Sequence, residues 1–396
     1  MSTLLSSPEA ALEAARQLAS EFARTAVARD RQGGIPKAER DAIRRSGLLT
    51  FAIGKEFGGS GGSWADTLAI IREFAQVDSS IAHLFAFHYY QLATLRLFGS
   101  TQQWQKLHRQ TVEQGWFWGN ALNRLEHGVI ATPRPDGAYE WSGRKSFATG
   151  TADADYITLS GARADDPTQS LIAAIPAGRE GITLLHDWDN IGQRQTSSGT
   201  VIFDKVVVNS DELLVNPGPF SSPFASARAL IGQTVFANLY LAIADGAFNL
   251  ALAHLRQKES PPWFESLAPT AQKDPFVLRH FGELWVKLEG ARALTEKVNA
   301  LIDPFWAKAE ALTAQERGEF AINVAKAKVA TTQVGLEVVT RIFEPLGARA
   351  TTAKLGYDRF WRNLRTQTLH DPVDYKILEL GDWILNGQLP PPSSYS

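Results

Sequence analysis

The chain has 396 residues, which is enough for two or three domains of ordinary size. Apolar residues make up 44% and charged residues 21%, a balance typical of globular proteins that excludes a disordered chain. Forty Lys and Arg residues against 42 Asp and Glu residues give a net charge of -2, so the chain lacks the basic character of proteins that bind nucleic acid or anionic membranes. Cysteine is absent, which excludes disulfides and thiolate sites and suits a reducing cytosol.

Two features argue against export or membrane insertion. The first residues, MSTLLSSPEAALEAAR, lack the basic segment and apolar core of a secretory signal. The most apolar stretch, 229–251, contains Gln233, Asn238 and Asp245, so we expect a buried helix rather than a membrane span. The sequence therefore predicts a cytoplasmic protein.

The first 115 residues have the spacing of helices. Ser7 and Pro8 form an N-cap and first-turn pair, and apolar residues then recur with helical periodicity as far as Ala26. Further helices are predicted over 39–46, 66–77 and 83–97. The glycine-rich segment 58–62 fits neither phosphate-binding glycine pattern, so we expect a structural turn there.

The middle zone, residues 116–224, contains short β-branched and aromatic runs separated by Gly, Pro, Asp and Ser. We predict strands there at 139–141, 156–159, 171–175 and 201–203. This spacing is typical of a small antiparallel barrel or sandwich.

From residue 225 to the end, helical periodicity returns, with helices predicted over 229–258, 275–308, 314–345 and 372–386. Helices of this length are normal in an antiparallel bundle. The fold class is thus α+β and mostly α, divided into 1–115, 116–224 and 225–396. A β module between two helical parts creates a cleft at the junction, where ligands bind.

Three segments in series resemble those of the acyl-CoA dehydrogenase superfamily. They read KEFGGSGG, WSGRKSFATGTADADYITLSG and IGQRQTSSGTVIFDKVVVNSDELL, and their order and spacing match over nearly the whole chain. The resemblance implies an N-terminal helical domain, a central antiparallel β-barrel and a C-terminal four-helix bundle.

The sequence departs from the dehydrogenases at two functional segments. GNALNRLEHG stands where they carry a loop that helps to hold acyl-CoA. LHDPVDYKIL stands where they often carry the catalytic glutamate, so that His370-Asp371 replaces Glu-Gly. The segment 359–377 and the shorter segments HLF, GNA and RQTSSG resemble instead the flavin-dependent two-component monooxygenases of the dibenzothiophene monooxygenase type.

This second resemblance implies an enzyme that uses reduced flavin and O2, by way of a C4a-hydroperoxide, to oxygenate an apolar aromatic substrate. The substrate class is an organosulfur heterocycle such as dibenzothiophene, or an indole-like ring. FMN is the expected flavin and FAD the alternative. Because no dinucleotide-binding fingerprint is present, a separate NAD(P)H:flavin reductase is expected, and the subgroup usually forms homotetramers.

His370 is the leading catalytic candidate, because an imidazole can donate a proton near neutral pH. Asp371 and Pro372 have the pattern of an N-cap and first turn of the next helix. His83 and His88 lie about 140° apart around a helix and cannot share a metal ion, so no metal site is expected. The resemblance points to His83 as the catalytic and substrate-pocket histidine.

Other flavin contacts are implied by the resemblance alone. Asn120 and Thr149 correspond to polar residues on two strands that face the flavin ring and can hydrogen-bond N5, in catalytic and cofactor-binding roles. Phe147 corresponds to an aromatic residue that packs on the ring. Arg349, in LGARATT, resembles a flavin-phosphate contact made from a neighbouring subunit.

A second phosphate arginine of the subgroup is replaced by Pro261, and Arg256 and Lys258 are the candidates to substitute for it. Gln367 stands where close relatives have a second histidine. The implied substrate pocket contains His83, Phe87, Trp188, Ser198 and Trp306, and Phe87 falls where the sulfur-heterocycle oxygenases often have a tyrosine.

Two other functions stay open. An acyl-CoA dehydrogenase needs a carboxylate base beside bound FAD, and Glu379 or Glu344 are the candidates, although neither matches the motif position. A non-catalytic flavoprotein would tolerate loss of His370.

Overall fold

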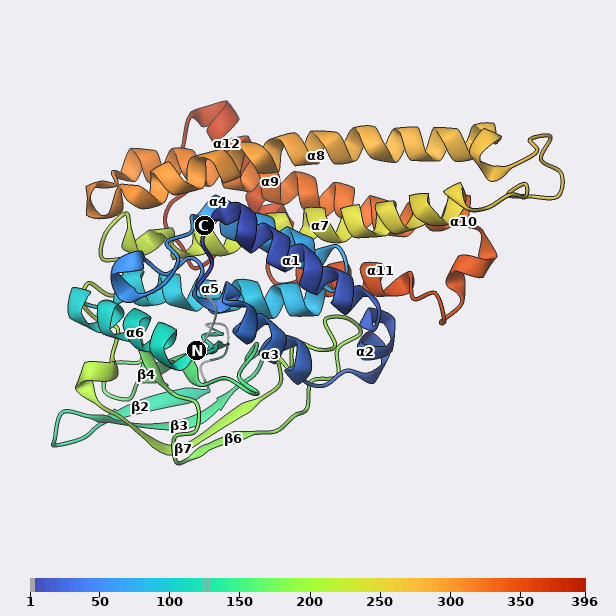
Figure 1. The fold of residues 1–396 in the computed structure, drawn as a ribbon. Helices are drawn as coiled ribbons and strands as arrows, with labels where there is room; N and C mark the ends of the chain where they lie inside the picture. The colour runs from blue at the N-terminus through green and yellow to red at the C-terminus, as the bar shows by residue number, and fades with distance from the viewer. Residues whose placement is uncertain (1–3, 124–125, 127) are drawn as a thin grey trace.

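The computed structural model describes residues 4–123, 126 and 128–396 (Figure 1). The α-helices are α1 (Pro8–Ala23), α2 (Ala26–Gln32), α3 (Lys37–Ser46), α4 (Trp64–Ala75), α5 (Ser79–Phe98), α6 (Thr101–Gln114), α7 (Arg228–Arg256), α8 (Pro275–Ala307), α9 (Ala314–Arg341), α10 (Phe343–Leu346), α11 (Asp358–Thr368) and α12 (Val373–Asn386). The strands are β1 (Trp118–Ala121), β2 (Val129–Pro133), β3 (Tyr139–Lys145), β4 (Tyr156–Arg163), β5 (Ser170–Pro176), β6 (Ile182–Leu184) and β7 (Val201–Val208).

The strands form one sheet in the order β1-β4-β2-β3-β7-β6, with β5 on the other edge of β4. β4 pairs in parallel with β1 and with β2, and the remaining pairings are antiparallel. The implied antiparallel barrel is therefore corrected to a mixed sheet. The parallel pairing arises because β2 and β3 intervene in the chain between β1 and β4.

In Figure 1 the sheet lies against the N-terminal helices, and α7, α8 and α9 form a bundle on the far side of α5. Helices α5 and α7 are buried over nearly their whole length. The segment Ala225–Arg256 is long and apolar enough to cross a membrane, but 83% of its most apolar window is buried inside the protein. The predicted buried helix is thus confirmed, and α5 lies between α7 and the sheet.

One apolar core joins the helices of the first 115 residues to those after residue 225, while the sheet has a second core of its own. The expected boundaries at 115/116 and 224/225 fall between α6 and β1 and ahead of α7. The division into three domains stays a prediction, because the two helical parts are continuous in their packing.

Side chains cap the beginnings of α1, α4, α5, α6, α8 and α9. Ser7 accepts a hydrogen bond from the Ala10 backbone N–H at 3.2 Å, as the sequence predicts. The prediction that Asp371 caps the last long helix is wrong, because Pro372 occupies the N-cap of α12 and no side chain caps it. The Asp371 carboxylate instead points inward, toward a buried lysine.

Candidate active site

A cavity of about 510 Å³ lies between the sheet, α5, α7, α11 and the C-terminal tail. Its volume is within the range of small-molecule and cofactor sites. Eight residues singled out by the sequence line it, namely His83, Phe87, Asn120, Phe147, Thr149, Trp188, Ser198 and His370. Segments up to 287 residues apart in the chain, from His83 to His370, therefore meet in one chamber.

Helix α5 supplies one wall of this cavity. His83, Phe87 and Tyr90 lie four and three residues apart, so they share one face of the helix. The His83 and Phe87 rings meet edge to face with centroids 4.3 Å apart. Burial, with a smaller contribution from His370, lowers the pKa of His83 to about 3, so its imidazole is neutral.

His370 is held from behind by a buried ion pair. Its Nδ1 lies 3.0 Å from Asp371 Oδ1, and the same oxygen lies 3.2 Å from Lys328 Nζ. Lys328 also donates to Gln233 Oε1 at 2.6 Å. An ionised carboxylate only accepts, so Nδ1 carries a hydrogen and Nε2 is the ring nitrogen that Asp371 does not engage. The His370 side chain is 42% exposed, whereas Lys328 is 1% exposed.

The charges of this pair are set by opposing effects. Burial alone would raise the pKa of Asp371, but the hydrogen bond from His370 and the attraction of Lys328 outweigh it and hold the pKa below its ordinary value. Burial lowers the pKa of Lys328 to about 8, against the attraction of Asp371. At neutral pH the carboxylate is therefore ionised and the ammonium is largely protonated.

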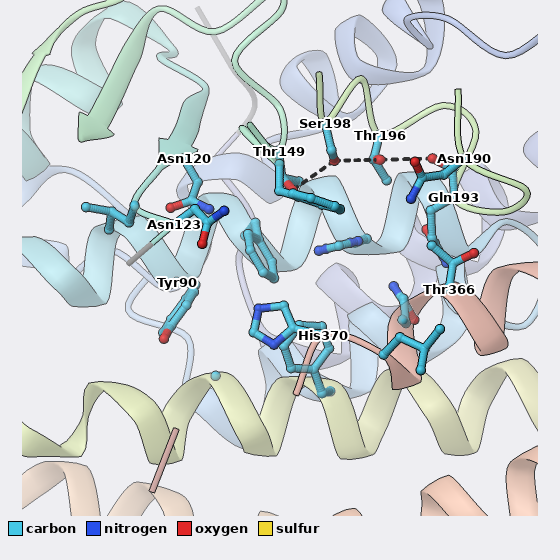
Figure 2. A pocket seen from close by; sticks show the side chains of 18 of the residues that line it. Tyr90, Asn120, Asn123, Thr149, Asn190, Gln193, Thr196, Ser198, Thr366 and His370 are labelled. Atoms are coloured by element: carbon cyan, nitrogen blue, oxygen red, sulfur yellow. Dashed lines mark hydrogen bonds between the residues drawn. The ribbon is translucent and has the colours of Figure 1, made fainter. Parts of the chain in front are cut away.

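A chain of hydroxyl groups borders the opposite wall (Figure 2). Thr196 Oγ1 donates to the Gln193 carbonyl at 2.9 Å, Ser198 Oγ donates to Thr196 at 2.7 Å, and Thr149 Oγ1 lies 2.9 Å from Ser198 Oγ. A carbonyl only accepts, so each hydroxyl must donate toward it. Thr149 therefore donates to Ser198, and the remaining capacity of its oxygen is as an acceptor.

The resemblance implied that Thr149 lies on a strand. The structure places it instead in the turn that follows β3. This turn begins at Phe147, whose φ of 54° is uncommon for a non-glycine residue. The Phe147 ring stands edge to face with the Trp188 ring at 5.7 Å. Asn120 does lie on β1, as expected.

Several buried polar atoms at the cavity wall have no hydrogen-bond partner. They are both ring nitrogens of His83, Asn120 Oδ1, Gln193 Oε1, and both amide atoms of Gln367. Buried polar groups in folded proteins are almost always paired, so this set indicates a polar ligand. It supplies donors and acceptors together, as the N–H and carbonyl edge of an isoalloxazine requires. The residues present therefore fit a flavin.

The cavity is lined by two guanidinium groups, Arg228 and Arg365. Among the described residues that line it, none is Asp or Glu. The two carboxylates considered as a dehydrogenase base lie elsewhere, with Glu344 bound by Arg341 and Glu379 by Lys376. The cavity therefore attracts anions and offers no carboxylate to abstract a proton.

Two sequence-predicted residues do not line the cavity. Trp306 packs against the rings of Trp64 at 5.8 Å and Phe224 at 5.2 Å, near the Arg96 guanidinium, and its expected substrate contact stays a prediction. Arg349 lies exposed after α10. Its contact was expected from a neighbouring subunit, and it stays a prediction.

The remaining candidates have clear positions. His88 is fully buried, with Nε2 2.8 Å from the Leu49 carbonyl and Nδ1 accepting from the Trp118 N–H, so it serves the fold. Arg256 and Lys258 lie at the end of α7, and neither lines the cavity. Their role in phosphate binding therefore stays untested.

Sequence reasoning missed several residues of the lining. The spacing of Tyr90 after His83 and Phe87 on one helix face was an available signal. Phe236 lies within the predicted helix 229–258 and Arg228 directly before it, and neither carries a local mark of function. Arg365 lies in the segment 359–377 that carries the resemblance, but it was not singled out there. Ser394 and Tyr395 come from a proline-rich tail that folds back, so that the Tyr395 ring lies 5.8 Å from the His370 ring.

Comparisons with known proteins agree with this geometry. The model of the acyl-CoA dehydrogenase N-terminal domain matches residues 7–114, and that of the acyl-CoA dehydrogenase C-terminal domain matches residues 234–375. A probable FMNH2-dependent monooxygenase, SfnC of Pseudomonas putida, is 55% identical over 98% of this chain and 98% of its own length.

Two solved structures are similar over the whole chain. Methanesulfinate monooxygenase MsuC from Pseudomonas fluorescens has a TM-score of 0.95 and 53% identity, covering 97% of this chain and 99% of that chain. The dibenzothiophene monooxygenase TdsC from Paenibacillus sp. A11-2, in complex with FMN and indole, has a TM-score of 0.92 and 42% identity, covering 98% and 99%.

The ion pair behind His370 makes a prediction about stability. Replacing Lys328 by Met leaves the buried Asp371 carboxylate without its cation, so we expect the free energy of unfolding to fall by about 3–5 kcal/mol. Urea denaturation followed by tryptophan fluorescence measures the change.

The matched control is Lys287→Met, which removes the exposed pair with Glu337 at 2.6 Å. An exposed pair contributes at most about 1 kcal/mol. Equal losses in the two variants would contradict the assignment of Lys328 as the counter-ion of a buried site.

Proposed function

We propose that this chain, which belongs to the acyl-CoA dehydrogenase superfamily and within it to the FMNH2-dependent monooxygenases of the dibenzothiophene monooxygenase type, transfers one atom of O2 to an organosulfur compound. Membership confirms the predicted superfamily, fold class, enzyme class and reduced-FMN cofactor. The observation that carries the proposal is a flavin-sized cavity in which an imidazole, and no carboxylate, is presented by a buried ion pair.

Reduced FMN, when bound, supplies two electrons and activates O2. The unpartnered amide oxygens of Asn120 and Gln193 and the unpartnered amide of Gln367 would hold the polar edge of its ring. Arg365, next to Thr366 at one end of the cavity, would pair with its phosphate, because a guanidinium binds phosphate through two parallel hydrogen bonds. Arg349 of a neighbouring subunit remains the second proposed phosphate contact.

The hydroxyl chain favours the reduced form of the flavin. Thr149 donates to Ser198 and therefore accepts from the cavity. Reduced flavin carries a hydrogen at N5, whereas oxidised flavin presents N5 as an acceptor, so a fixed acceptor at Thr149 matches only the reduced state. The same contact would keep the N5 hydrogen in place during the reaction.

His370 would supply the proton that the second oxygen atom needs to leave as water. Asp371 holds the ring through Nδ1, so Nε2 is the atom that exchanges a proton in the cavity. The Phe236 ring, 4.6 Å from His370, and the Phe87 ring exclude water from this side. Neutral His83 would hydrogen-bond substrate or flavin without competing for the proton.

The substrate would lie against the apolar wall formed by Phe87, Trp188 and Phe236. Relatives act on sulfur compounds of two kinds, since TdsC is a dibenzothiophene monooxygenase and MsuC a methanesulfinate monooxygenase. The aromatic heterocycles expected from the sequence, dibenzothiophene-like or indole-like, belong to the first kind. We propose oxygenation at sulfur as the shared reaction.

The assembly around the enzyme follows from its chemistry. A separate NAD(P)H:flavin reductase would supply reduced FMN, and the enzyme would work in the cytoplasm.

Large apolar side chains are exposed on α8 and α12, among them Trp285, Val286, Ile384 and Leu385. Exposed large apolar side chains at neighbouring positions of a helix are frequent at protein interfaces, which supports the proposed homotetramer.

The proposed function is tested with purified enzyme, a flavin reductase, NADH, FMN and a panel of organosulfur compounds under isotopically labelled O2. We expect one labelled oxygen atom in the product. Bleaching of a bound flavin by acyl-CoA, without oxygenation, would favour the dehydrogenase instead.

Replacing His370 by Ala is expected to lower the rate of oxygenation about 10²–10⁴-fold, because general acid catalysis contributes that much. Electrons from NADH should then appear as hydrogen peroxide, measured with a peroxidase assay beside product formation. His254→Gln, at an exposed site outside the cavity, is the control and should change neither quantity. Unchanged coupling in His370→Ala would exclude His370 as the proton donor.

Ser198→Ala removes the acceptor toward which Thr149 donates, so the Thr149 hydroxyl becomes able to donate into the cavity. We expect the preference for reduced over oxidised FMN to fall about fivefold, the worth of one neutral hydrogen bond. Anaerobic titrations of each flavin form, followed by tryptophan fluorescence, give the two affinities. Ser198→Thr keeps the hydroxyl and should keep the preference; the same ratio in both variants would refute the polarity argument.

The interface proposal predicts that Ile384→Lys with Leu385→Lys lowers the mass of the assembly from four chains to fewer, measured by light scattering during size-exclusion chromatography. These side chains are 71% and 82% exposed in the single chain. Ile130→Lys on β2, also an exposed apolar position, should leave the mass unchanged. A monomeric wild-type protein would overturn the proposal.

A further inference from the structure

The segment 389–396, here called the strap, returns from α12 to the active-site cavity and is held there by one buried arginine (Figure 1). Arg317 on α9 is 1% exposed, and its Nη1 donates to the Pro390 carbonyl at 3.2 Å. Its Nη2 donates to the Ser396 carbonyl, and its Nε donates to Ser226 Oγ at 3.2 Å. A buried guanidinium is stable only when its donors are paired, so Arg317 fixes the strap at both of its ends.

A glycine on α9 makes room for the beginning of the strap. Gly318 follows Arg317 in the chain, and a Cβ atom at Gly318 would come within 2.7 Å of Leu389 Cδ1 and 2.9 Å of Leu389 Cβ. These distances are too short for ordinary contact, so a side chain at position 318 would displace Leu389. Glycine at 318 is therefore required for the strap to lie where Arg317 binds it.

The part of the strap between these two ends is a stiff loop. Pro391, Pro392 and Ser393 are exposed, so little packing holds them. Consecutive prolines restrict the backbone and lower the entropy that is lost when the loop is ordered. A turn follows, in which the Ser393 N–H donates to the Ser396 carbonyl at 2.8 Å. Ser394 and Tyr395 lie inside this turn.

Ser394 and Tyr395 form part of the cavity wall. The Tyr395 ring stands edge to face with the His370 ring, with centroids 5.8 Å apart and 73° between the ring planes. Ser394 also lines a smaller cavity of about 40 Å³, which shares Leu122 and Ala229 with the first. The strap therefore closes the active-site cavity beside the proposed proton donor and borders a side cavity next to it.

We propose that Tyr395 determines the size of the substrate, and that Arg317 and Gly318 position it through the strap. This inference rests on the proposed function and concerns which organosulfur compounds fit at the oxygenation site. One cavity of about 510 Å³ must hold the isoalloxazine ring and the substrate together, so the phenol side chain at its wall limits the space left for the substrate. Apolar walls discriminate by size, since one methylene group changes the specificity about 10- to 200-fold.

The test uses two pairs of probes, benzothiophene with dibenzothiophene and methanesulfinate with benzenesulfinate. The members of a pair share the reacting group and differ in size, and the quantity measured is the ratio of kcat/KM for the larger member to that for the smaller. Tyr395→Ala should raise this ratio about 10- to 100-fold, because a large side chain leaves the wall. Tyr395→Phe keeps the ring and should keep the ratio within about threefold. A purely structural loss would lower both members of a pair together.

The positioning role is tested from α9, at a residue that does not line the cavity. Gly318→Ala should displace Leu389 and raise the ratio in the same direction as Tyr395→Ala, by a smaller factor. The matched control is Gly290→Ala on α8, where an added Cβ would meet nothing within 4 Å, and it should leave the ratio unchanged.

A measurement without turnover reports where the strap lies. The chain has no cysteine, so Ser394→Cys introduces a single thiol at a partly buried position. Because modification of a thiol follows its exposure, we expect Gly318→Ala to raise the rate of its reaction with a thiol reagent at least about threefold. Gly290→Ala should not change this rate, and thermal unfolding shows that each variant is folded.

The outcomes separate this inference from the proposed function. An unchanged ratio in folded Tyr395→Ala means that Tyr395 does not set the size of the substrate, and an equal rise in Tyr395→Phe would assign the effect to the hydroxyl group; either result overturns the inference. If Gly318→Ala changes neither the ratio nor the thiol reaction, the positioning role is wrong. If the wild-type enzyme, supplied with reduced FMN, oxygenates none of the four probes, the proposed function fails whatever residue 395 does.

Discussion

The active site depends on one buried ion pair. Lys328 and Asp371 come from α9 and from the turn before α12, and their charges lie 3.2 Å apart with both side chains almost fully buried. A single charge there would be very costly, so each requires the other. His370 takes its orientation from the same carboxylate. The packing of the C-terminal helices therefore fixes the position of the His370 imidazole at the cavity.

This arrangement explains why the chain before α12 does not use an ordinary helix cap. Asp371 has the residue type and place of an N-cap, but its carboxylate faces Lys328 and His370 instead of the first turn. Pro372 at the N-cap has no N–H that needs a partner. Asp371 therefore makes a long-range contact with Lys328 in place of a local helix cap, as is common at sites where function competes with local preference.

The sequence predicted the long elements well, since periodicity and caps are local. The helix expected over 275–308 is found as Pro275–Ala307, with Asp274 as its cap. The short strands β2 and β6 were missed, and β1 was expected only from the resemblance, because three to five residues give too little alternation to recognise. Helix α11 was missed because it is strongly polar, and its buried residues are explained only by the neighbours it packs against.

The sequence predicted those cavity residues whose side chains suggest a reaction. It missed residues that line the cavity only because of their position in the fold. His83 and His370 were identified through the resemblance, yet the ion pair of Asp371 with Lys328 joins residues 43 positions apart with no shared motif. Arg228 begins a helix whose apolar pattern hides it, and Tyr90 looks like a core residue of α5. Only the crossing of α5 and α7 places these two side chains together.

Replacing the dehydrogenase carboxylate by an imidazole changes the chemistry of the cavity, because a carboxylate can only accept a proton in its ionised form whereas an imidazole can both accept and donate one near neutral pH. Lys328 balances the charge of Asp371 behind His370, so the carboxylate that orients the ring stays ionised and out of the cavity lining. The same replacement therefore removes the base that a dehydrogenase needs and leaves in its place a group that can exchange a proton with an oxygen atom.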